Sequence, residues 1–251
     1  MQQKTALLRK FTAAISLLTA IRMPDRVSLR EEELRGTQMF FPFVGAGLGF
    51  ALAGIYGLLI RRLPAQVTIV GVLTVALTIT AARNEQSLAR VADAMQRGTR
   101  ESRREKLKHT LLGTVGTITL TLTLILKFAL LSYLPPQQCW WALLAGSICG
   151  CWMMVALRQV TEYTASGNEL GTALSRRLPW KQFVGVTVLC ALVTLPLGPV
   201  AGIATWLMVF LALFMTKHFL KGLFGGLMIE SARAAAIIGE LTVYFAAAMF
   251  R

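Results

Sequence analysis

The stretch LLGTVGTITLTLTLILKFALL, residues 111–131, contains a single charged side chain, that of Lys127. A helix needs roughly 17–25 predominantly apolar residues to cross about 30 Å of bilayer hydrocarbon. This stretch therefore predicts a transmembrane helix. The whole chain has the same character, because 55% of its 251 residues are hydrophobic and only 15% are charged. That composition is too apolar for an ordinary soluble domain.

Further segments have a similar length and composition, or fall a little short of it. Together with the first they are Met39–Ile60, Ala65–Ala82, Leu111–Leu131, Cys139–Leu157, Phe183–Pro196, Val200–Thr216 and Ala234–Phe250. Phe183–Pro196 is short and ends at a proline, which breaks helices. The sequence thus predicts an all-α fold, a polytopic integral membrane helical bundle of about seven transmembrane helices.

An additional helix is expected at the amino terminus. Thr5–Arg22 has apolar residues at helical spacing but carries Arg9 and Lys10, so it should lie at the membrane interface or against the bundle. We interpret residues 1–251 as a single membrane domain. Its first 38 residues form a cytoplasmic or interfacial segment, and residues 83–110 form the main cytoplasmic polar loop.

The basic charge follows the predicted topology. Of the 26 Lys and Arg residues, 22 lie in Met1–Gln38, Arg83–Thr110, Arg158–Gln182 and Lys217–Arg233. These segments share one side of the membrane, and an excess of Lys and Arg marks the cytoplasmic side. The amino terminus is therefore predicted to be cytoplasmic. No loop combines basic and aromatic residues into a nucleic-acid platform, so membrane lipids, not nucleic acid, are the expected partners of these charges.

The polar stretch NEQSLARVADAMQRG, residues 84–98, has a helical pattern with Leu88, Val91, Ala92 and Met95 on one face. With the Leu-Thr pair seven residues before it, this stretch resembles the motif of the cobalamin synthase family (adenosylcobinamide-GDP ribazoletransferase). The family pattern is close to L-T-G-G-L-H-L-D-G-L-A-D-T-A-D-G.

Four other segments resemble the same family in order along the chain. FPFVG (41–45) with Leu48-Gly49 resembles F-P-L-V-G-x-x-L-G, and KHTLLGTVG (108–116) resembles K-D-S-R-I-G-T-F-G. Glu162-Tyr163 to Leu170-Gly171 resembles the Y-A-R-x-E-G-L-G loop. GGLMIESARAAAIIGE (225–240) resembles G-G-x-T-G-D-x-L-G-A-x-x-E-L-x-E.

The resemblance implies a bacterial inner-membrane enzyme of cobalamin biosynthesis. Family members join adenosylcobinamide-GDP to α-ribazole or its phosphate and release GMP. Phosphoryl transfer of this kind depends on positioning and on cancelling charge with Mg²⁺ and cationic side chains. Carboxylates at i, i+4 and i+7 share one helix face, so the family's three aspartates can hold Mg²⁺ against the phosphates.

This chain departs from the family pattern at its charged positions. The three aspartates fall on Gln86, Arg90 and Asp93, and the aspartate of T-G-D falls on Glu230. The resemblance nevertheless supplies a set of candidate site residues. They are Asp93 and Lys108 as catalytic residues, Asp93 and Glu230 as Mg²⁺ ligands, and Arg90, Tyr163, Gly113 and Gly116 for substrate binding.

Simpler roles stay open for several candidates. Asp93 is equally consistent with a surface acid paired with Arg90 or Arg97 at helical spacing. Gly113 and Gly116 are also typical of close helix packing at the start of a span. Lys127 and Glu240 both fall within predicted spans, where an ion pair between them would remove two isolated charges.

Three functions remain open from the sequence. The first is a working cobamide synthase with an altered site, active with Mg²⁺. The second is a catalytically silent relative that binds a corrinoid, a phosphorylated or nucleotide-linked ligand, a membrane protein partner or a second copy of itself. The third is an unrelated small transporter, although the spans lack the paired broken helices typical of that class.

Overall fold

The computed structural model describes residues 2–21, 34, 36–96, 98–107, 111–163, 173, 176–194 and 199–250. Within these ranges the fold is helical, as the composition predicts. The elements are α1 (Gln2–Leu18), the 3-10 helix η1 (Thr37–Phe40), α3 (Phe41–Leu59), α4 (Ala65–Thr80), α5 (Arg83–Ala94), α6 (Arg100–Lys106), α7 (Thr114–Tyr133), α8 (Pro136–Val160), α10 (Trp180–Thr194), α11 (Pro199–Phe224) and α12 (Ile229–Met249).

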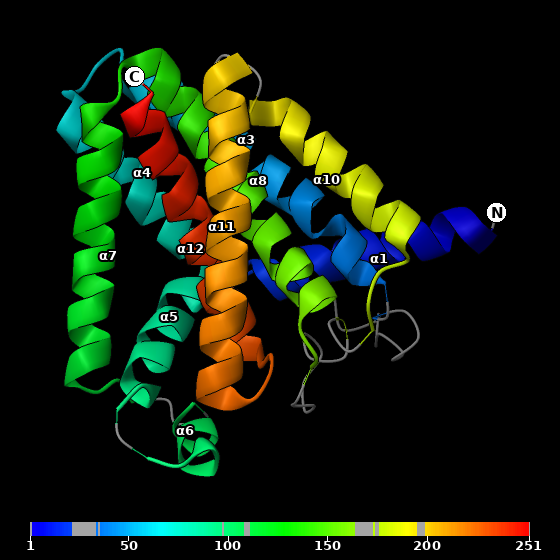
Figure 1. Ribbon diagram of the computed structural model, residues 1–251. Helices are drawn as coiled ribbons and strands as arrows, with labels where there is room; N and C mark the ends of the chain where they lie inside the picture. Colours follow the sequence, from blue (N-terminus) through cyan, green and yellow to red (C-terminus); the bar gives the residue numbers. More distant parts are fainter. Residues whose placement is uncertain are drawn as a thin grey trace.

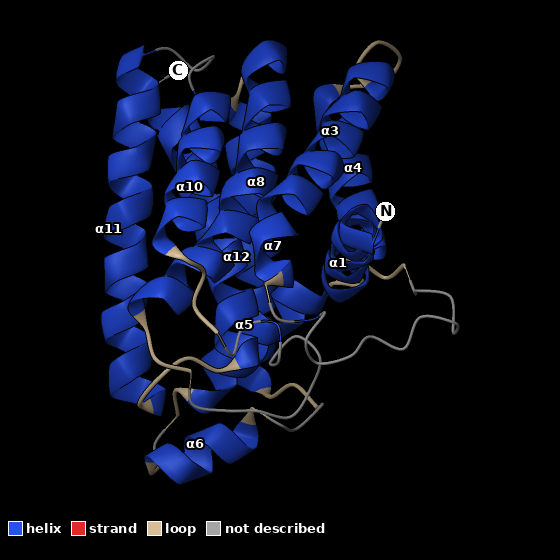
Figure 2. Ribbon diagram, turned by 90° about the vertical axis from the view of Figure 1, so that its right-hand side faces the viewer, coloured by secondary structure: helices blue, strands red, loops and turns tan. Residues whose placement is uncertain are grey.

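The long helices run back and forth between two ends of the bundle (Figures 1 and 2). The connection from α11 to α12 and helix α6 lie at one end, and the end of α12 lies at the other. Each segment predicted to span the membrane overlaps one of these helices. The predicted all-α membrane bundle is therefore confirmed.

The number of spans differs from the expected seven. Among the described residues, five helices are long and apolar enough to cross a membrane, or six if the bent pair α4 and α5 counts as one span. Helix α10, in the place of the predicted span Phe183–Pro196, has only 15 residues in Trp180–Thr194. At 1.5 Å per residue it is shorter than the hydrocarbon core.

Helix α1 lies against the bundle and runs crosswise to α7 and α11 in Figure 1. Ala13, Ala14 and Leu17 on one face are buried, whereas Leu7 and Leu8 are exposed. Its buried face packs on η1 and α3. Of the two expected positions for this helix, the structure supports packing against the bundle.

Helix α8 forms the centre of the core, and its residues 142–158 are all buried. Two glycines allow its neighbours to approach closely. A Cβ on Gly49 of α3 would lie 2.9 Å from the Cα of Leu144, and a Cβ on Gly150 would lie 2.8 Å from the carbonyl oxygen of Ala236 in α12. Small residues at such crossings are how membrane helices gain packing energy.

A sharp break separates α4 from α5. Ala81 and Ala82 have φ angles of 51° and 50°, in the left-handed region that non-glycine residues rarely adopt. The two helix axes meet at 84°. As a result α5 packs along α7 and α12, so the first half of the expected polar loop 83–110 is part of the bundle.

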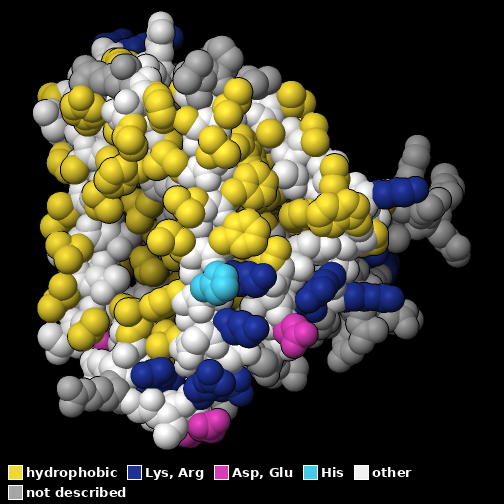
Figure 3. Space-filling view, in the orientation of Figure 1, with side chains coloured by type: hydrophobic (Ala, Val, Ile, Leu, Met, Phe, Trp, Pro, Cys, Tyr) yellow, Lys and Arg dark blue, Asp and Glu magenta, His cyan; other side chains and the backbone are white. Residues whose placement is uncertain are grey.

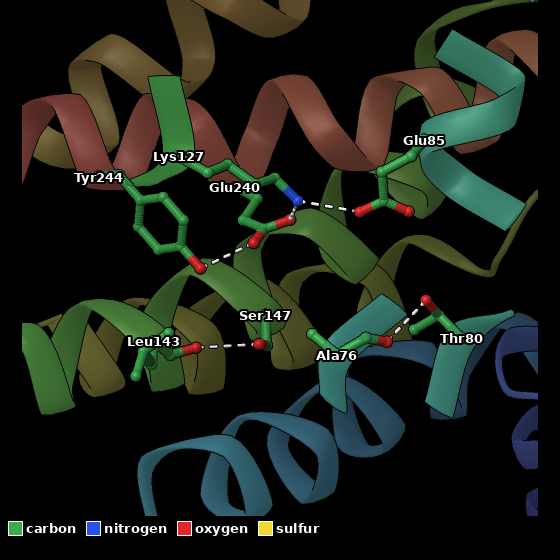
Figure 4. Close-up of polar contacts among 8 residues, drawn as sticks. All are labelled: Ala76, Thr80, Glu85, Lys127, Leu143, Ser147, Glu240 and Tyr244. Carbon is green, nitrogen blue, oxygen red and sulfur yellow. Dashed lines mark hydrogen bonds and ion pairs between the residues drawn. The ribbon is translucent and has the colours of Figure 1, made fainter. Parts of the chain in front are cut away.

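A buried ion cluster joins α5, α7 and α12 (Figure 4). Lys127 Nζ lies 2.8 Å from Glu240 Oε2 and 3.0 Å from Glu85 Oε1. The Tyr244 hydroxyl donates to Glu240 Oε1 at 2.7 Å. The predicted pair of Lys127 with Glu240 is confirmed, and Glu85 is a third member that the sequence did not indicate.

Hydrophobic and basic side chains occupy different parts of the surface. In Figure 3 hydrophobic side chains cover most of the upper part of the visible face, and Lys and Arg gather at the lower end, around and beside α6. This distribution is typical of a membrane protein whose apolar surface faces the lipid and whose basic end lies on one side of the membrane.

Candidate functional site

Three arginines and one glutamate gather where α5 meets the first turns of α12. Arg233 of α12 lies within electrostatic reach of Arg83 and Arg90 of α5 and of Glu230. Arg83 and Arg90 are seven residues apart and share a face of α5, and Glu230 and Arg233 are three apart on α12. We call these four residues the arginine cluster. Its cations outnumber its acid, which favours an anionic ligand.

The packing of α1 holds one arginine of this cluster. Arg83 Nη1 donates to the carbonyl oxygens of Thr19 at 3.0 Å and Ser16 at 3.3 Å, at the carboxyl end of α1. A cation at that end of a helix is stabilised by the unpaired carbonyl groups. Helix α1 thus fixes the orientation of Arg83.

Arg90 differs, because its Nε atom is buried and has no hydrogen-bond partner within the described ranges. Buried polar groups in proteins are nearly always paired, so an unpaired one points to a ligand or solvent partner. A guanidinium group presents planar donors that match phosphate oxygens. Arg90 thus offers a donor that an anionic ligand can use.

Tyr163 lies beside this cluster. Tyr163 forms a bridge to Leu227, two residues before the start of α12, and the Leu227 N–H donates to the Glu162 carbonyl at 2.8 Å. The Tyr163 hydroxyl is buried and has no hydrogen-bond partner in the described part of the chain. Burial, with the negative charge of Glu230, raises the pKa of Tyr163 to about 12. The phenol is therefore protonated at neutral pH and available as a donor.

The carboxylate of Asp93 is already hydrogen-bonded, unlike that of a ligand with free oxygens for a metal ion. Its Oδ2 accepts the N–H of Gly113 and its Oδ1 accepts the N–H of Gly116, both at 2.7 Å. These N–H groups belong to the start of α7, where a helix lacks internal acceptors. Asp93 therefore caps α7 from a neighbouring helix, a role that neither the metal site nor the surface ion pair anticipated.

Gly113 and Gly116 fit this capping arrangement. A Cβ on Gly113 would lie 2.8 Å from Asp93 Oδ1, and a Cβ on Gly116 would lie 2.7 Å from the Ala89 carbonyl oxygen. Both glycines therefore permit the close approach of α7 to α5, which was one of their two expected roles. Lys108, the other candidate catalytic residue, lies outside the described residues.

The described side chains do not fit the Mg²⁺ site that the resemblance implies. No group of three or more His, Cys, Asp or Glu side chains in the described ranges is placed to hold a metal ion. Both oxygens of Asp93 already accept backbone N–H groups, and Glu230 lies among arginines. Cations beside a carboxylate compete with a metal ion for it.

An apolar cavity of about 470 Å³ lies on another face of α5, toward α7, α11 and α12. Leu88, Val91, Ala92 and Met95 line it, and these are the residues that the helical pattern placed on one face. Helix α5 therefore separates an apolar cavity from the arginine cluster.

The sequence contained part of the information needed to predict Arg83 and Arg233 as members of the arginine cluster. Arg83 and Arg90 follow the seven-residue spacing of one helix face, so their proximity could have been predicted from α5 alone. Arg233 lies about 140 residues further along the chain. Only the packing of α12 on α5 brings it to the same place.

Comparison with known proteins agrees with this architecture. The family described as Cobalamin-5-phosphate synthase matches residues 10–246. A protein of Pseudomonas fluorescens (strain Pf-5) named adenosylcobinamide-GDP ribazoletransferase is 29% identical over 96% of this chain and 99% of its own length. One of Pseudomonas syringae pv. syringae with the same name is 31% identical over 91% of this chain and 93% of its own.

A third protein with that name, from Geotalea daltonii, is 36% identical over 49% of this chain and 50% of its own length. No solved structure matches the chain. The family match covers nearly all the helices described above, from within α1 to within α12. The chain therefore belongs to the cobalamin-5-phosphate synthase family.

Proposed function

We propose that this protein joins adenosylcobinamide-GDP to α-ribazole or its phosphate and releases GMP, as the names of its relatives describe. We also propose that the arginine cluster holds the phosphates of the nucleotide-linked substrate. The observation that carries the proposal is the buried Nε of Arg90, which has no hydrogen-bond partner among the described residues and lies near Arg83 and Arg233.

The proposed reaction is a substitution at phosphorus. A hydroxyl oxygen of α-ribazole forms a new bond to the phosphorus that bears the corrinoid, the bond from that phosphorus to GMP breaks, and the hydroxyl proton passes to solvent. Phosphoryl transfer is catalysed mainly by positioning and by neutralising the charge on the phosphate oxygens. Arginine side chains that already lie in place can do both without reorganising during the reaction.

Within this cluster Glu230 is a positioning residue. It lies one turn before Arg233 on α12 and supplies the cluster's only carboxylate. Its negative charge attracts the Arg233 guanidinium and limits repulsion among the cations. No step of the proposed reaction passes through Mg²⁺, because the described side chains do not form a suitable binding site for that ion. The reaction should be measured both with and without the ion.

Tyr163 is expected to donate a hydrogen bond to the bound phosphate. Tyr163→Phe should weaken adenosylcobinamide-GDP binding by about tenfold, since a hydrogen bond to a charged group contributes about 1.5 kcal/mol or more. A pKa near 12 keeps the phenol protonated at pH 10, where an ordinary tyrosine has lost half of its protons. The ratio of the two affinities should therefore be the same at pH 8 and pH 10.

Isothermal titration calorimetry on the detergent-purified protein measures both affinities. Tyr133→Phe is a matched control, because Tyr133 is an exposed tyrosine at the far end of α7. Equal affinities for the wild type and Tyr163→Phe would remove Tyr163 from the site. A ratio that falls to one at pH 10 would mean that the phenol ionises there.

We also propose that the protein lies in the bacterial inner membrane with its amino terminus and basic end in the cytoplasm. The asymmetry of Lys and Arg supports this orientation. In intact spheroplasts a membrane-impermeant maleimide should label Arg62→Cys, between α3 and α4, and should label Glu101→Cys of α6 only after lysis. The four natural cysteines are buried and give a low background. The reverse labelling pattern would overturn the orientation.

A further inference from the structure

The apolar cavity beside α5 opens on the outer surface of the bundle. Thr119 of α7 lines one side of it, and Met215 and Phe219 of α11 line the other. Figure 1 shows α5 and α12 between these two helices, and both contribute to the lining. Met215 is 66% exposed and Met95, at the end of α5, is 47% exposed. An exposed apolar recess of this kind marks a place where a ligand, a lipid or a partner binds.

The level of the cavity along α11 matches the depth at which lipid chains begin. Its lining residues on α11 run from Met215 to Leu220, and the helix ends at Phe224. At a rise of about 1.5 Å per residue, they lie about 6–14 Å from that end. The headgroup region on each side of a bilayer is about 5–8 Å thick. With the end of α11 at the membrane surface, the cavity therefore lies just inside the hydrocarbon.

Basic side chains lie at the same end of the cavity. Arg104 of α6 donates through Nε and Nη2 to the carbonyl oxygen of Phe224, at 2.9 Å and 2.6 Å. Arg100 is exposed and lies beside the next residue, since a Cβ on Gly225 would lie 4.0 Å from its Nη1. Figure 3 shows Lys and Arg at this end, below the hydrophobic side chains. Helix α6 thus places cations at the end of α11, next to the cavity.

These cations can bind a phosphate group. Helix α6 has four basic and two acidic side chains among its seven residues, so its net charge is positive. The Phe224 carbonyl takes only two of the N–H groups of Arg104, and a guanidinium has five. Arginine donors match phosphate oxygens. Cations beside a membrane-spanning helix also attract anionic lipids. The surface at α6 is therefore complementary in charge to an anionic phospholipid headgroup.

We infer that the cavity binds one anionic phospholipid, with an acyl chain along Leu88 and Met95 of α5 and the phosphate at Arg100 and Arg104 of α6. Charge complementarity selects this occupant, because an uncharged apolar partner would leave the cations of α6 without a counter-charge. The lipid contacts α5, α6 and α11 together and holds the end of α5 in place. The site lies on another face of α5 from the arginine cluster, so it is separate from the proposed substrate site.

Native mass spectrometry of the purified protein in an uncharged detergent tests the inference. Titration with phosphatidylglycerol should show one tightly bound lipid per chain, and phosphatidylcholine with the same acyl chains should bind at least about fivefold more weakly. Arg100→Gln should lower the affinity for phosphatidylglycerol about fivefold, whereas Arg61→Gln, an exposed arginine between α3 and α4, should not. Ala92→Phe fills the cavity and should abolish binding. Ala51→Phe, at an exposed alanine of α3, should bind as the wild type does.

Three results would overturn the inference: no saturable binding, equal affinities for the two lipids, or wild-type affinity in folded Ala92→Phe. A dimer that binds no phosphatidylglycerol and separates in Ala92→Phe would assign the cavity to a second copy and also overturn it. If Ala92→Phe does not fold, cross-linking of the wild type by phosphatidylglycerol with a photoactivatable acyl chain decides. Adducts on Met95, Met215 or Phe219 support the site, and adducts confined to other residues, or none, overturn it.

Discussion

Replacing Lys127 by methionine is expected to lower the free energy of unfolding by about 3–5 kcal/mol, the usual cost of removing one partner from a buried ion pair. Methionine has nearly the same length as lysine, so packing changes little. The loss arises because Glu85 and Glu240 then face each other in the core without a cation. Tyr244 still donates to Glu240, but a single neutral donor does not replace an ammonium group.

Unfolding by sodium dodecyl sulfate in mixed micelles, followed by circular dichroism, measures this loss. Lys181→Met is the matched control, because Lys181 is an exposed lysine on α10 and surface substitutions usually change stability by less than about 0.5 kcal/mol. Adding Glu240→Gln to Lys127→Met should recover part of the stability, since it removes one of the two unpaired carboxylates. A loss in Lys127→Met no larger than in the control would contradict the ion cluster.

Asp93→Ala is expected to destabilise the protein by about 2–3 kcal/mol, because it leaves the N–H groups of Gly113 and Gly116 without acceptors at the start of α7. The carboxylate also interacts favourably with the positive end of that helix. Asp93→Asn keeps an oxygen acceptor but loses the charge, so its loss should be smaller. The same unfolding assay measures both variants, with Glu105→Ala on exposed α6 as control.

The Asp93 result separates a structural role from a catalytic one. If Asp93 acts only as a cap, activity per folded molecule should survive in Asp93→Asn under conditions where that variant is folded. A variant with the stability of the wild type and no activity would contradict the capping role and return Asp93 to the group of metal ligands. Asp93→Ala alone is a poor test of catalysis, because it alters the position of α7.

Periodicity and composition were sufficient to predict most helices of this fold. The apolar segments became α3, α4, α7, α8, α10, α11 and α12. The polar helix α5 was recognised from the spacing of Leu88, Val91, Ala92 and Met95, which now line one cavity. The Lys127–Glu240 pair followed from the cost of isolated charges within spans. These predictions depend on local pattern or on simple electrostatics, both of which are visible in one sequence.

The break after α4 could not be predicted in the same way. Ala81 and Ala82 adopt left-handed conformations, and neither residue is a glycine or proline, the residue types that would indicate a break in the sequence. The break folds α5 back along α7 and α12, and this brings Glu85 to Lys127 and Asp93 to the start of α7. Each of these roles depends on a partner on another helix. Helix propensity alone therefore cannot predict them.

The arginine cluster illustrates the same limit at the site. The substitution of Arg90 for a family aspartate suggested a phosphate contact, but Arg233 joins it only through the packing of α12 on α5. Where the resemblance implies a metal site, the structure has a group of cations around Arg90, whose Nε has no partner in the described part of the chain. We propose that these side chains supply the positive charge that the family pattern assigns to Mg²⁺.

The most direct test of this account is GMP release by the lipid-reconstituted protein given adenosylcobinamide-GDP and α-ribazole phosphate, with and without Mg²⁺. The account predicts release by the wild type and a rate about 10–100-fold lower in Arg90→Ala, since a donor aimed at developing charge contributes an effect of this order. Arg62→Ala, an exposed arginine between α3 and α4, should keep the wild-type rate. Absence of GMP release by the folded wild type, or an unchanged rate in Arg90→Ala, would contradict it.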